Sequence, residues 1–475
     1  MAISMAVGTR RRVRRAFRAG SALDLGGAYV EARLLVDLLR GGGGGRLDLA
    51  GARIVGELDL TGVRVETPVR LRGCVSEDRL VLEQADLVAV DLDGCTFAGV
   101  QGGGVRVAGD LVARDASIGG DVWLLSARVG GVVEWDRSRV DGAVFVQRSE
   151  IGGGLHVRDA VLGRGLRVAG ARIGVNVDLS RARIGPAPDS GAAITGGGLV
   201  VGGAVFGHDL VAGGEIHLVG AQVTGAVTLQ NTTLRGRDGG HSLLLIEAQM
   251  RLLTLRPAPD SAGTISLRDA RVGRLVDDPV NWPPGCRIEL DGLTYERLSR
   301  RTEDTAQWSA RQRLAWMARF VLGSAPGPYD QLAAALARDG REQEARRVRV
   351  VRERRRHRAM GWAGAVWGAV QDAGIGFGYR PGRALLWLLA VVAGSTGWFA
   401  WSGPLRAVKA DEAPTWDPFL YSVDILVPLL DLGHDKAFDP VGADKAVALA
   451  VLATGWILAT TVLAGAGRTL GRGGQ

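Results

Sequence analysis

The chain has 475 residues, of which 71 are glycine and only 5% are aromatic, and its formal net charge is +8. Glycine in excess without a strict three-residue period excludes collagen, and a hydrophobic share of 47% in regular positions argues against disorder. Three cysteines, at 74, 95 and 286, are too few for a disulfide framework or a zinc site. We expect no metal and no cofactor.

The N-terminal part of the chain is basic. Residues 1–25 form an arm that carries six arginines between Arg10 and Arg18 and lacks the apolar stretch of a signal peptide. Residues 26–45, "GGAYVEARLLVDLLRGGGGG", have helical spacing and end in a glycine run. A helix here would cap the first coil of a repeat domain, because an open end exposes strand edges and core.

A repeat of 11 residues dominates the middle of the chain. One aliphatic series consists of Ile118, Val129, Val140, Ile151, Leu162, Ile173 and Ile184. Fixed-period self-similarity indicates a solenoid, and alternation broken by glycine indicates short strands and turns. We therefore predict a mainly β fold, with a β-helix solenoid over 46–300 in which two 11-residue half-coils make one coil. Cys74 and Cys95 should then be neighbours on adjacent coils.

The outward positions of this solenoid leave alternatives open. Arg128, Glu150 and Arg172 stand 22 residues apart, which fits either an ordinary surface charge ladder or a ligand-binding stripe. Trp123 and Trp135 are interpreted as packing residues. The interruption at 185–198 is a loop and a candidate for partner contact.

The inward aliphatic residues and the alanine-rich column resemble pentapeptide-repeat and related β-helix proteins, in which five-residue sides stack as quadrilateral coils. The resemblance covers about residues 46–300. Some of those proteins resemble DNA in shape and carry acidic faces. This rod instead carries outward arginines at 53, 64, 128, 139, 172 and 183, so we do not expect DNA mimicry.

Residues 301–381 have the spacing of α-helices, and one stretch resembles a single tetratricopeptide-like hairpin broken at "RDG". Its second half is rich in arginine. We predict that this part binds anionic lipid headgroups, and nucleic acid is a weaker candidate because the segment lies next to a predicted membrane domain. The headgroup residues are Arg346, Arg347, Arg349, Arg352, Arg354, Arg355, Arg356 and Arg358.

Residues 382–470 contain two uncharged apolar stretches, 384–403 and 446–464. Each is long enough for a helix to cross a bilayer, which predicts a transmembrane hairpin. Arginines before the first stretch and after the second place the solenoid and both termini in the cytoplasm, at the inner (plasma) membrane, with the loop 404–445 outside.

The loop between these stretches is too apolar for a plain solvated connection. Residues 416–440 are predicted to form an interfacial or re-entrant segment, in which carboxylates near the membrane are usually functional. Its candidate pore or loop residues are Tyr421, Asp424, Pro428, Asp431 and His434. The layout resembles two-span ion channels, but the T-x-G-[Y/F]-G filter of potassium channels is absent.

"GFGYRPGRALLWLL" (376–389) and "YSVDILVPLLDLG" (421–433), together with the β-helix, resemble a group of actinobacterial membrane proteins. Many of these are named membrane-associated oxidoreductases. This sequence has no P-loop, no dinucleotide-binding G-x-G-x-x-G and no H-E-x-x-H motif. We therefore expect no catalysis, and oxidoreductase activity follows from the family name alone.

The combined prediction is a membrane-anchored cytoplasmic β-helix that acts as a scaffold or recognition protein. It would bind a protein partner or self-associate as a homo-oligomer. The alternative is an oligomeric ion channel or sensor that uses the segment 416–440.

Overall fold

The computed structural model describes the backbone of residues 2–470 except 42–43, 237–238, 301–307, 324, 360–380, 410–412 and 428–431. Within the described helices, the side chains of 2–7, 358–359, 381–385 and 458–470 are left out of the description. The chain divides into two compact units, Met1–Gln331 and Leu332–Gln475. Each unit is described by itself below.

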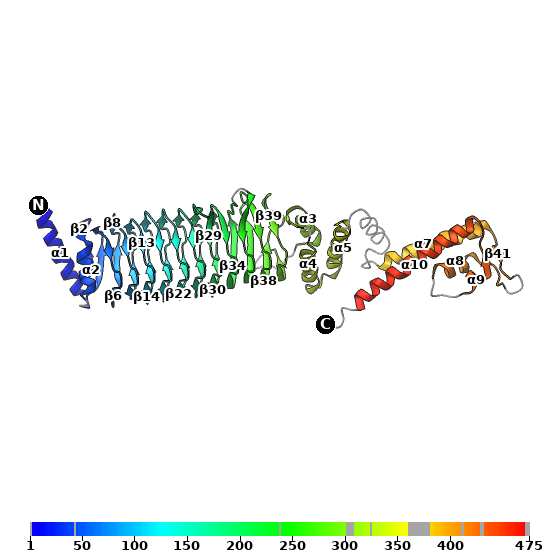
Figure 1. The fold of residues 1–475 in the computed structure, drawn as a ribbon, viewed down its shortest axis with the longest axis horizontal. Helices are drawn as coiled ribbons and strands as arrows, with labels where there is room; N and C mark the ends of the chain where they lie inside the picture. The colour runs from blue at the N-terminus through cyan, green and yellow to red at the C-terminus, as the bar shows by residue number, and fades with distance from the viewer. Residues whose placement is uncertain are drawn as a thin grey trace. The chain divides into compact units, whose positions relative to one another are not determined.

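The first unit is a parallel β-solenoid of about 12 turns, which appears as a row of stacked coils in Figure 1. A central coil uses 22 residues and four short strands, β14 (Arg106–Val107), β15 (Leu111–Val112), β16 (Ser117–Ile118) and β17 (Val122–Trp123). Each strand pairs with the residues one coil later, so Arg106 faces Arg128 and Val122 faces Val144. The predicted solenoid with an 11-residue half-coil is confirmed.

The strands form three sheets along the solenoid. The largest sheet supplies two sides of the coil and contains β1 (Leu23–Asp24), β3 (Leu47–Ala50), β6 (Arg64–Val65), β7 (Val69–Arg72), β10 (Asp86–Leu87), β11 (Val90–Asp91), β14, β15, β18 (Arg128–Val129), β19 (Val133–Glu134), β22 (Glu150–Ile151), β23 (Leu155–His156), β26 (Arg172–Ile173), β27 (Val177–Asp178), β30 (Val200–Val201), β31 (Val205–Phe206), β34 (Gln222–Thr232), β36 (Gln249–Pro257), β38 (Arg271–Asp277) and β40 (Thr294–Ser299).

The other two sheets supply one side each. The second contains β2 (Tyr29–Glu31), β4 (Arg53–Val55), β8 (Val75–Ser76), β12 (Thr96–Phe97), β16, β20 (Arg139–Val140), β24 (Val161–Leu162), β28 (Arg183–Ile184) and β32 (Val211–Ala212). The third contains β5 (Leu58–Asp59), β9 (Leu80–Val81), β13 (Val100–Gln101), β17, β21 (Val144–Phe145), β25 (Leu166–Arg167), β29 (Ala192–Thr195), β33 (Glu215–His217), β35 (His241–Leu244), β37 (Ala262–Ser266) and β39 (Gly285–Glu289).

The core of the solenoid consists of stacked aliphatic columns. The series from Ile118 to Ile184 is 3% exposed or less at every member. Each such side chain contributes roughly 1.5–3 kcal/mol on burial, but no coil closes a core alone, so stability is collective. The predicted neighbours Cys74 and Cys95 are both buried and lie on adjacent coils, because the residues that follow them, Val75 and Thr96, are paired in register.

Two kinds of turn join the four sides. One kind places a non-glycine residue at positive φ, such as Asp115, Ser126 and Arg137. The other kind needs glycine because the coils approach closely there. A Cβ at Gly152 would lie 2.4 Å from the carbonyl oxygen of Gly130, and one at Gly174 would lie 2.1 Å from that of Gly152. Glycine in these turns is therefore required by stacking, not by backbone conformation.

Helices cover the first coil. The basic N-terminal arm forms α1 (Ala2–Ala19), whose Val13, Ala16 and Phe17 are buried. In the segment expected to cap the solenoid, residues Tyr29–Glu31 form strand β2, and α2 (Ala32–Arg40) follows with Leu34, Leu35, Val36 and Leu39 buried. These helices cover the apolar surface that the first coil would otherwise expose to solvent.

The far end of the solenoid packs against α3 (Ala310–Phe320). The rings of Trp282 and Trp316 meet edge to face, with centroids 5.2 Å apart. Beside them Arg313 forms an ion pair with Asp277, and both side chains are only 3% exposed. Burial raises the pKa of the Asp277 carboxyl, and the neighbouring Arg313 guanidinium opposes that rise. After α3 comes α4 (Gly327–Arg338), and the boundary between the two units, Gln331 to Leu332, falls within this helix.

The second unit is helical, with α5 (Glu342–Ala359), α7 (Pro381–Ser402), α8 (Pro418–Leu426), α9 (His434–Ala437) and α10 (Ala443–Leu470), and a small two-stranded sheet of β41 (Arg406–Ala407) and β42 (Phe438–Asp439). Its core gathers Phe399, Tyr421, Ile425, Phe438 and Val451. The indole Nε1 of Trp398 on α7 donates a hydrogen bond of 2.9 Å to Asp444 on α10. Figure 1 shows α7 and α10 side by side.

The prediction of a transmembrane hairpin is not supported. The two apolar stretches do form helices, α7 and α10. However, within the described part of the chain, no helix is both long enough and apolar enough to cross a bilayer.

Candidate functional site

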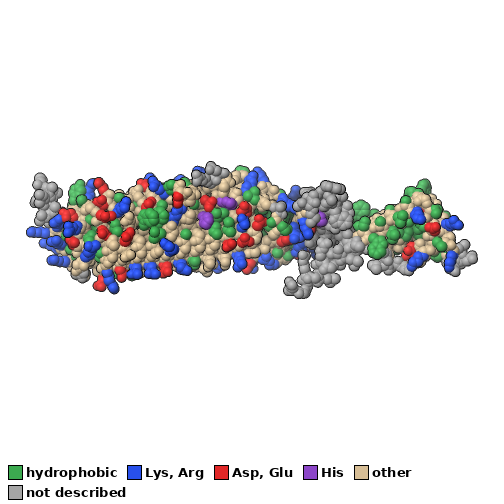
Figure 2. All heavy atoms as spheres, viewed as in Figure 1, with side chains coloured by type: hydrophobic (Ala, Val, Ile, Leu, Met, Phe, Trp, Pro, Cys, Tyr) green, Lys and Arg blue, Asp and Glu red, His purple; other side chains and the backbone are tan. Residues whose placement is uncertain are grey.

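One candidate surface is a charged edge of the solenoid, which we call the Arg edge. It consists of the outward residues Arg106, Arg128, Glu150 and Arg172, the first residues of β14, β18, β22 and β26. Each is paired in register with the next, so the four side chains form one row. Figure 2 shows both basic and acidic side chains along the edge that Figure 1 labels β6, β14, β22 and β30. This row confirms that these predicted outward positions are exposed.

A shallow groove of about 710 Å³ runs beside the Arg edge. Its floor includes Gly130, Gly152, Gly174 and Gly202. Because close stacking forbids a side chain at these turns, the groove is a direct result of the coil geometry. The guanidinium groups of the Arg edge stand at its rim.

The ion pairs of the Arg edge are incomplete. Arg128 lies 3.6 Å from Glu150, whereas Arg106 and Arg172 form no ion pair with any described residue. Elsewhere on the solenoid, arginines at tight turns are paired with the coil before, as Arg137 is with Asp115 and Arg181 with Asp159. In both pairs the guanidinium lowers the pKa of the carboxyl. The groove is lined by three arginines of the Arg edge and by two carboxylates, Asp86 and Glu150, so its positive charge is only partly offset.

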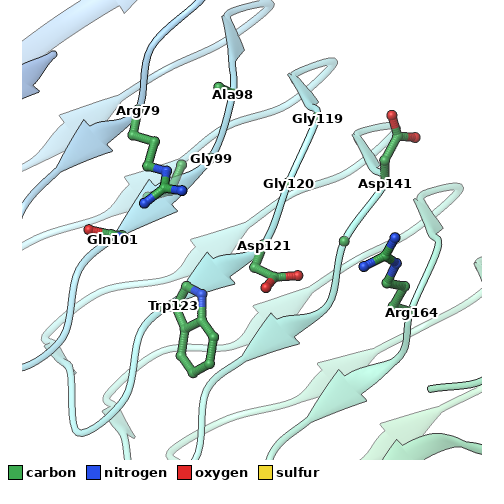
Figure 3. Close-up of a pocket in the computed structure, with 12 residues that line it drawn as sticks. Arg79, Ala98, Gly99, Gln101, Gly119, Gly120, Asp121, Trp123, Asp141 and Arg164 are labelled. Atoms are coloured by element: carbon green, nitrogen blue, oxygen red, sulfur yellow. The ribbon is translucent and has the colours of Figure 1, made fainter. Parts of the chain in front are cut away.

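A second candidate surface, which we call the Trp123 trough, is a hollow of about 310 Å³ where the turns between the second and third sheets meet the third sheet. Figure 3 shows the guanidinium groups of Arg79 and Arg164 pointing inward from its two ends, with Asp121 and Trp123 between them. Gly119, Gly120 and Gly142 line it without side chains. Neither Arg79 nor Arg164 forms an ion pair with a described residue.

An aromatic pair forms one wall of the Trp123 trough. Gln101, Trp123 and Phe145 are neighbours on successive coils of the third sheet. The rings of Trp123 and Phe145 stack with centroids 3.8 Å apart and planes 7° apart. Phe145 covers one face of the indole, and the other face looks toward Gln101. Trp123 therefore packs on Phe145 while it stays partly exposed, whereas Trp135 is buried in the core.

The two carboxylates of the trough already have partners on the solenoid. Oδ1 of Asp121 accepts a hydrogen bond of 2.8 Å from the backbone N–H of Ala143 on the next coil. Asp141 forms an ion pair of 2.9 Å with Arg139. The second oxygen of Asp121 has no partner among the described residues and is available as an acceptor.

The predicted contact loop at 185–198 folds against the same sheet. Arg167, the residue after Phe145 in the column, is nearly buried and forms an ion pair of 3.0 Å with Asp189 of this loop. The column Gln101–Trp123–Phe145–Arg167, with members 22 residues apart, is visible in the sequence. Because these residues occupy outward positions of successive strands, the column could have been used to predict a functional surface here from the sequence.

Three of the predicted residues of the segment 416–440, Tyr421, Asp424 and His434, lie in the folded second unit and are buried there. The carboxylate of Asp424 is buried and accepts hydrogen bonds from the backbone N–H groups of Leu432, His434 and Asp435 at 2.7, 2.8 and 2.9 Å. It therefore fixes the loop that leads into α9. Pro428 and Asp431 lie outside the described residues.

Tyr421 and His434 complete this cluster. Tyr421 is 1% exposed and packs edge to face on Phe399, with ring centroids 5.0 Å apart. Burial, and then the nearby Asp435, Asp439 and Asp444, raise the pKa of Tyr421 to about 12. His434 is buried beside Phe438, with centroids 6.2 Å apart. Tyr421 and His434 therefore belong to the core of the second unit.

The predicted headgroup arginines lie on α5, and part of their charge is balanced within the helix. Four of them are paired with Glu342 or Glu353, namely Arg346, Arg349, Arg352 and Arg356. The side chain of Arg358 lies outside the described residues, and the other predicted members are Arg347, Arg354 and Arg355. The helix keeps a net positive charge, because arginine outnumbers glutamate along it.

No group of three or more histidine, cysteine or acidic side chains is placed to hold a metal ion in the described ranges. Comparison with known protein families, with curated protein sequences and with solved structures finds no match. The coil geometry shows a β-solenoid repeat protein, and this is the level at which the chain is classified.

Proposed function

We propose that this chain is a recognition scaffold whose solenoid binds a protein partner along the Arg edge, while its second unit attaches to a membrane surface. The observation that carries the proposal is the row of Arg106, Arg128 and Arg172, which outnumber the two carboxylates beside a groove of about 710 Å³. Arg106 and Arg172 form no ion pair with a described residue, although Asp86 and Glu150 are their neighbours in register. Unpaired charge in register therefore suggests an external partner.

The chemistry of the Arg edge favours an acidic protein surface. A guanidinium presents a planar set of donors that matches a carboxylate in a two-pronged hydrogen bond. Arginine is also among the residues that dominate binding energy at protein interfaces. Because every residue of the row is held by parallel pairing to the coils on both sides, little backbone order is lost on binding.

The membrane part of the proposal rests on the surface of the second unit. Large apolar side chains are exposed on α7 and α10, including Leu386 at 67%, Trp401 at 80% and Leu449 at 58%. An exposed apolar patch of this kind marks a protein or membrane contact. The net positive charge of α5 would add attraction to anionic headgroups, at about 1 kcal/mol for each basic residue near the surface.

Photocrosslinking tests the Arg edge directly. A photoreactive amino acid replaces Ala108, which is exposed in the groove, and in a matched control it replaces Ser117, which is exposed on β16. We expect one discrete adduct in cells from position 108 and none from position 117. The adduct should disappear when Arg106→Glu and Arg172→Glu are combined.

An adduct that survives both charge reversals, or that forms equally from Ser117, would contradict binding at the Arg edge. Adducts only between copies of this chain would assign the edge to self-association instead of a protein partner. Flotation of the purified chain with vesicles containing anionic lipid tests the membrane part separately. It should be lost at high salt if headgroup charge is the main attraction.

A further inference from the structure

We propose that the Trp123 trough is a binding site for a neutral sugar chain. This inference goes beyond the scaffold function and does not depend on it, because the trough and the Arg edge are formed by different sides of the coil. It uses three features of the trough, which are its mixture of positive and negative groups, its aromatic wall and its floor without side chains.

The charge of the trough favours a neutral ligand. Arg79 and Arg164 contribute positive charge and Asp121 contributes negative charge between them, while the carboxylate of Asp141 is paired with Arg139. An acidic ligand that reached both guanidinium groups would pass the Asp121 carboxylate, which lies between them in Figure 3. A chain of hydroxyl groups has no such conflict, because each hydroxyl donates one hydrogen bond and accepts others. Guanidinium donors and carboxylate acceptors are therefore both satisfied.

The aromatic wall supplies the apolar contact that a sugar ring requires. A pyranose has a face of C–H bonds, and an indole offers a large apolar surface with a negative face that attracts such hydrogens. Phe145 fixes the indole from one side by stacking at 3.8 Å. Gln101, the neighbour on the other side, lines the trough as well and adds an amide that can both donate and accept.

The floor allows a chain to lie close to the backbone. A Cβ at Gly120 would be 2.6 Å from the carbonyl oxygen of Ala98, and one at Gly142 would be 2.4 Å from Oδ1 of Asp121. Side chains are thus excluded there by the coil itself. The volume of about 310 Å³ is at the small end of ligand sites in proteins, which suits a short piece of an oligosaccharide.

The test is isothermal titration of the full chain with a panel of hexasaccharides. Four are neutral, namely maltohexaose, cellohexaose, mannohexaose and xylohexaose, and hexagalacturonate and a hexaglutamate peptide are the acidic probes. We expect at least one neutral probe to bind. Trp123→Ala should weaken it by about tenfold or more, because the stacking contact is lost, and Arg164→Gln should weaken it less.

Arg172→Gln is the matched control, because it removes an exposed arginine without an ion pair from the other side of the coil. It should leave sugar binding unchanged. Should Trp123→Ala disturb the stack with Phe145, as seen by circular dichroism, Gln101→Ala serves as the second variant and should also weaken binding.

Three results would overturn the proposal. They are no binding of any neutral probe at millimolar concentration, binding that is unchanged in the Trp123→Ala and Gln101→Ala variants, and binding of the acidic probes alone. The last result, if abolished by Arg79→Gln and Arg164→Gln, would reassign the trough to an acidic ligand. Crosslinking at Ala108 stays a separate measurement, so the scaffold function can fail or hold without affecting this one.

Discussion

The solenoid and the second unit bury their cores in different ways. In the solenoid, each residue contacts the residue 22 positions away, and the same contact recurs from coil to coil. In the second unit, Phe399, Tyr421 and Phe438 meet once, at a single place. A repeat can therefore lose one contact and retain its neighbours.

The largest expected effect concerns the buried ion pair at the end of the solenoid. Arg313→Met should lower the free energy of unfolding by about 3–5 kcal/mol, because it leaves the buried Asp277 carboxylate without its partner. Urea unfolding followed by circular dichroism measures this change. Combining Arg313→Met with Asp277→Leu should restore most of the loss, and a double variant as unstable as the single one would contradict the charge explanation.

A coil in the middle of the solenoid should be nearly as sensitive. Leu155 is 0% exposed, and Leu155→Ala should cost about 2–5 kcal/mol through lost burial and the remaining cavity. Val175→Ala is the control, because Val175 is 49% exposed. Limited proteolysis should cut the Leu155→Ala chain near the altered coil. Uniform cutting along the whole solenoid would show that the coils do not behave as separable neighbours.

The pH dependence of the second unit follows from Tyr421. Its pKa is about 12 in the folded chain against 10.0 ordinarily, so between these values the unfolded state has lost a proton that the folded state keeps. Stability should therefore fall as pH rises from 10 to 12, by about 3 kcal/mol over two pKa units. Tyr421→Phe should flatten this part of the profile, and an unchanged slope would exclude Tyr421 as its source.

The smallest of these effects is expected at Asp424. Asp424→Asn retains one acceptor oxygen for three backbone N–H groups, and should destabilise the second unit by about 1–3 kcal/mol. Asp439→Asn, at an exposed position, is the control. A membrane role for Asp424 would instead predict an unchanged unfolding midpoint with a changed lipid interaction.

The sequence predicted the solenoid because its information is local and repeated. The column from Ile118 to Ile184 shows the period seven times, and every member is buried. The sequence predicts packing for Trp123 but does not indicate that the packing is on the outer surface of the solenoid. Its outward direction is set by alternation along β17, and its stacking on Phe145 by the register between coils.

The loop of the second unit could not be predicted in the same way. Asp424 was interpreted as a membrane carboxylate because its sequence neighbours are apolar. In the structure it is buried because three backbone N–H groups, 8 to 11 residues further along the chain, turn back to it. Almost any residue type can supply a backbone N–H group, so hydrogen bonds of this kind produce no recognisable pattern in the sequence.

The sequence by itself determined the period, the buried columns, the neighbouring cysteines and the outward arginines, because each depends on contacts that repeat at a constant separation. Only the tertiary structure decided which arginines lack a counter-charge, that Trp123 borders a trough with Arg79 and Arg164 at its ends, and that Asp424 holds a loop. These features depend on side chains from several coils, or from distant segments, meeting at one place, and a single meeting has no periodicity to reveal it.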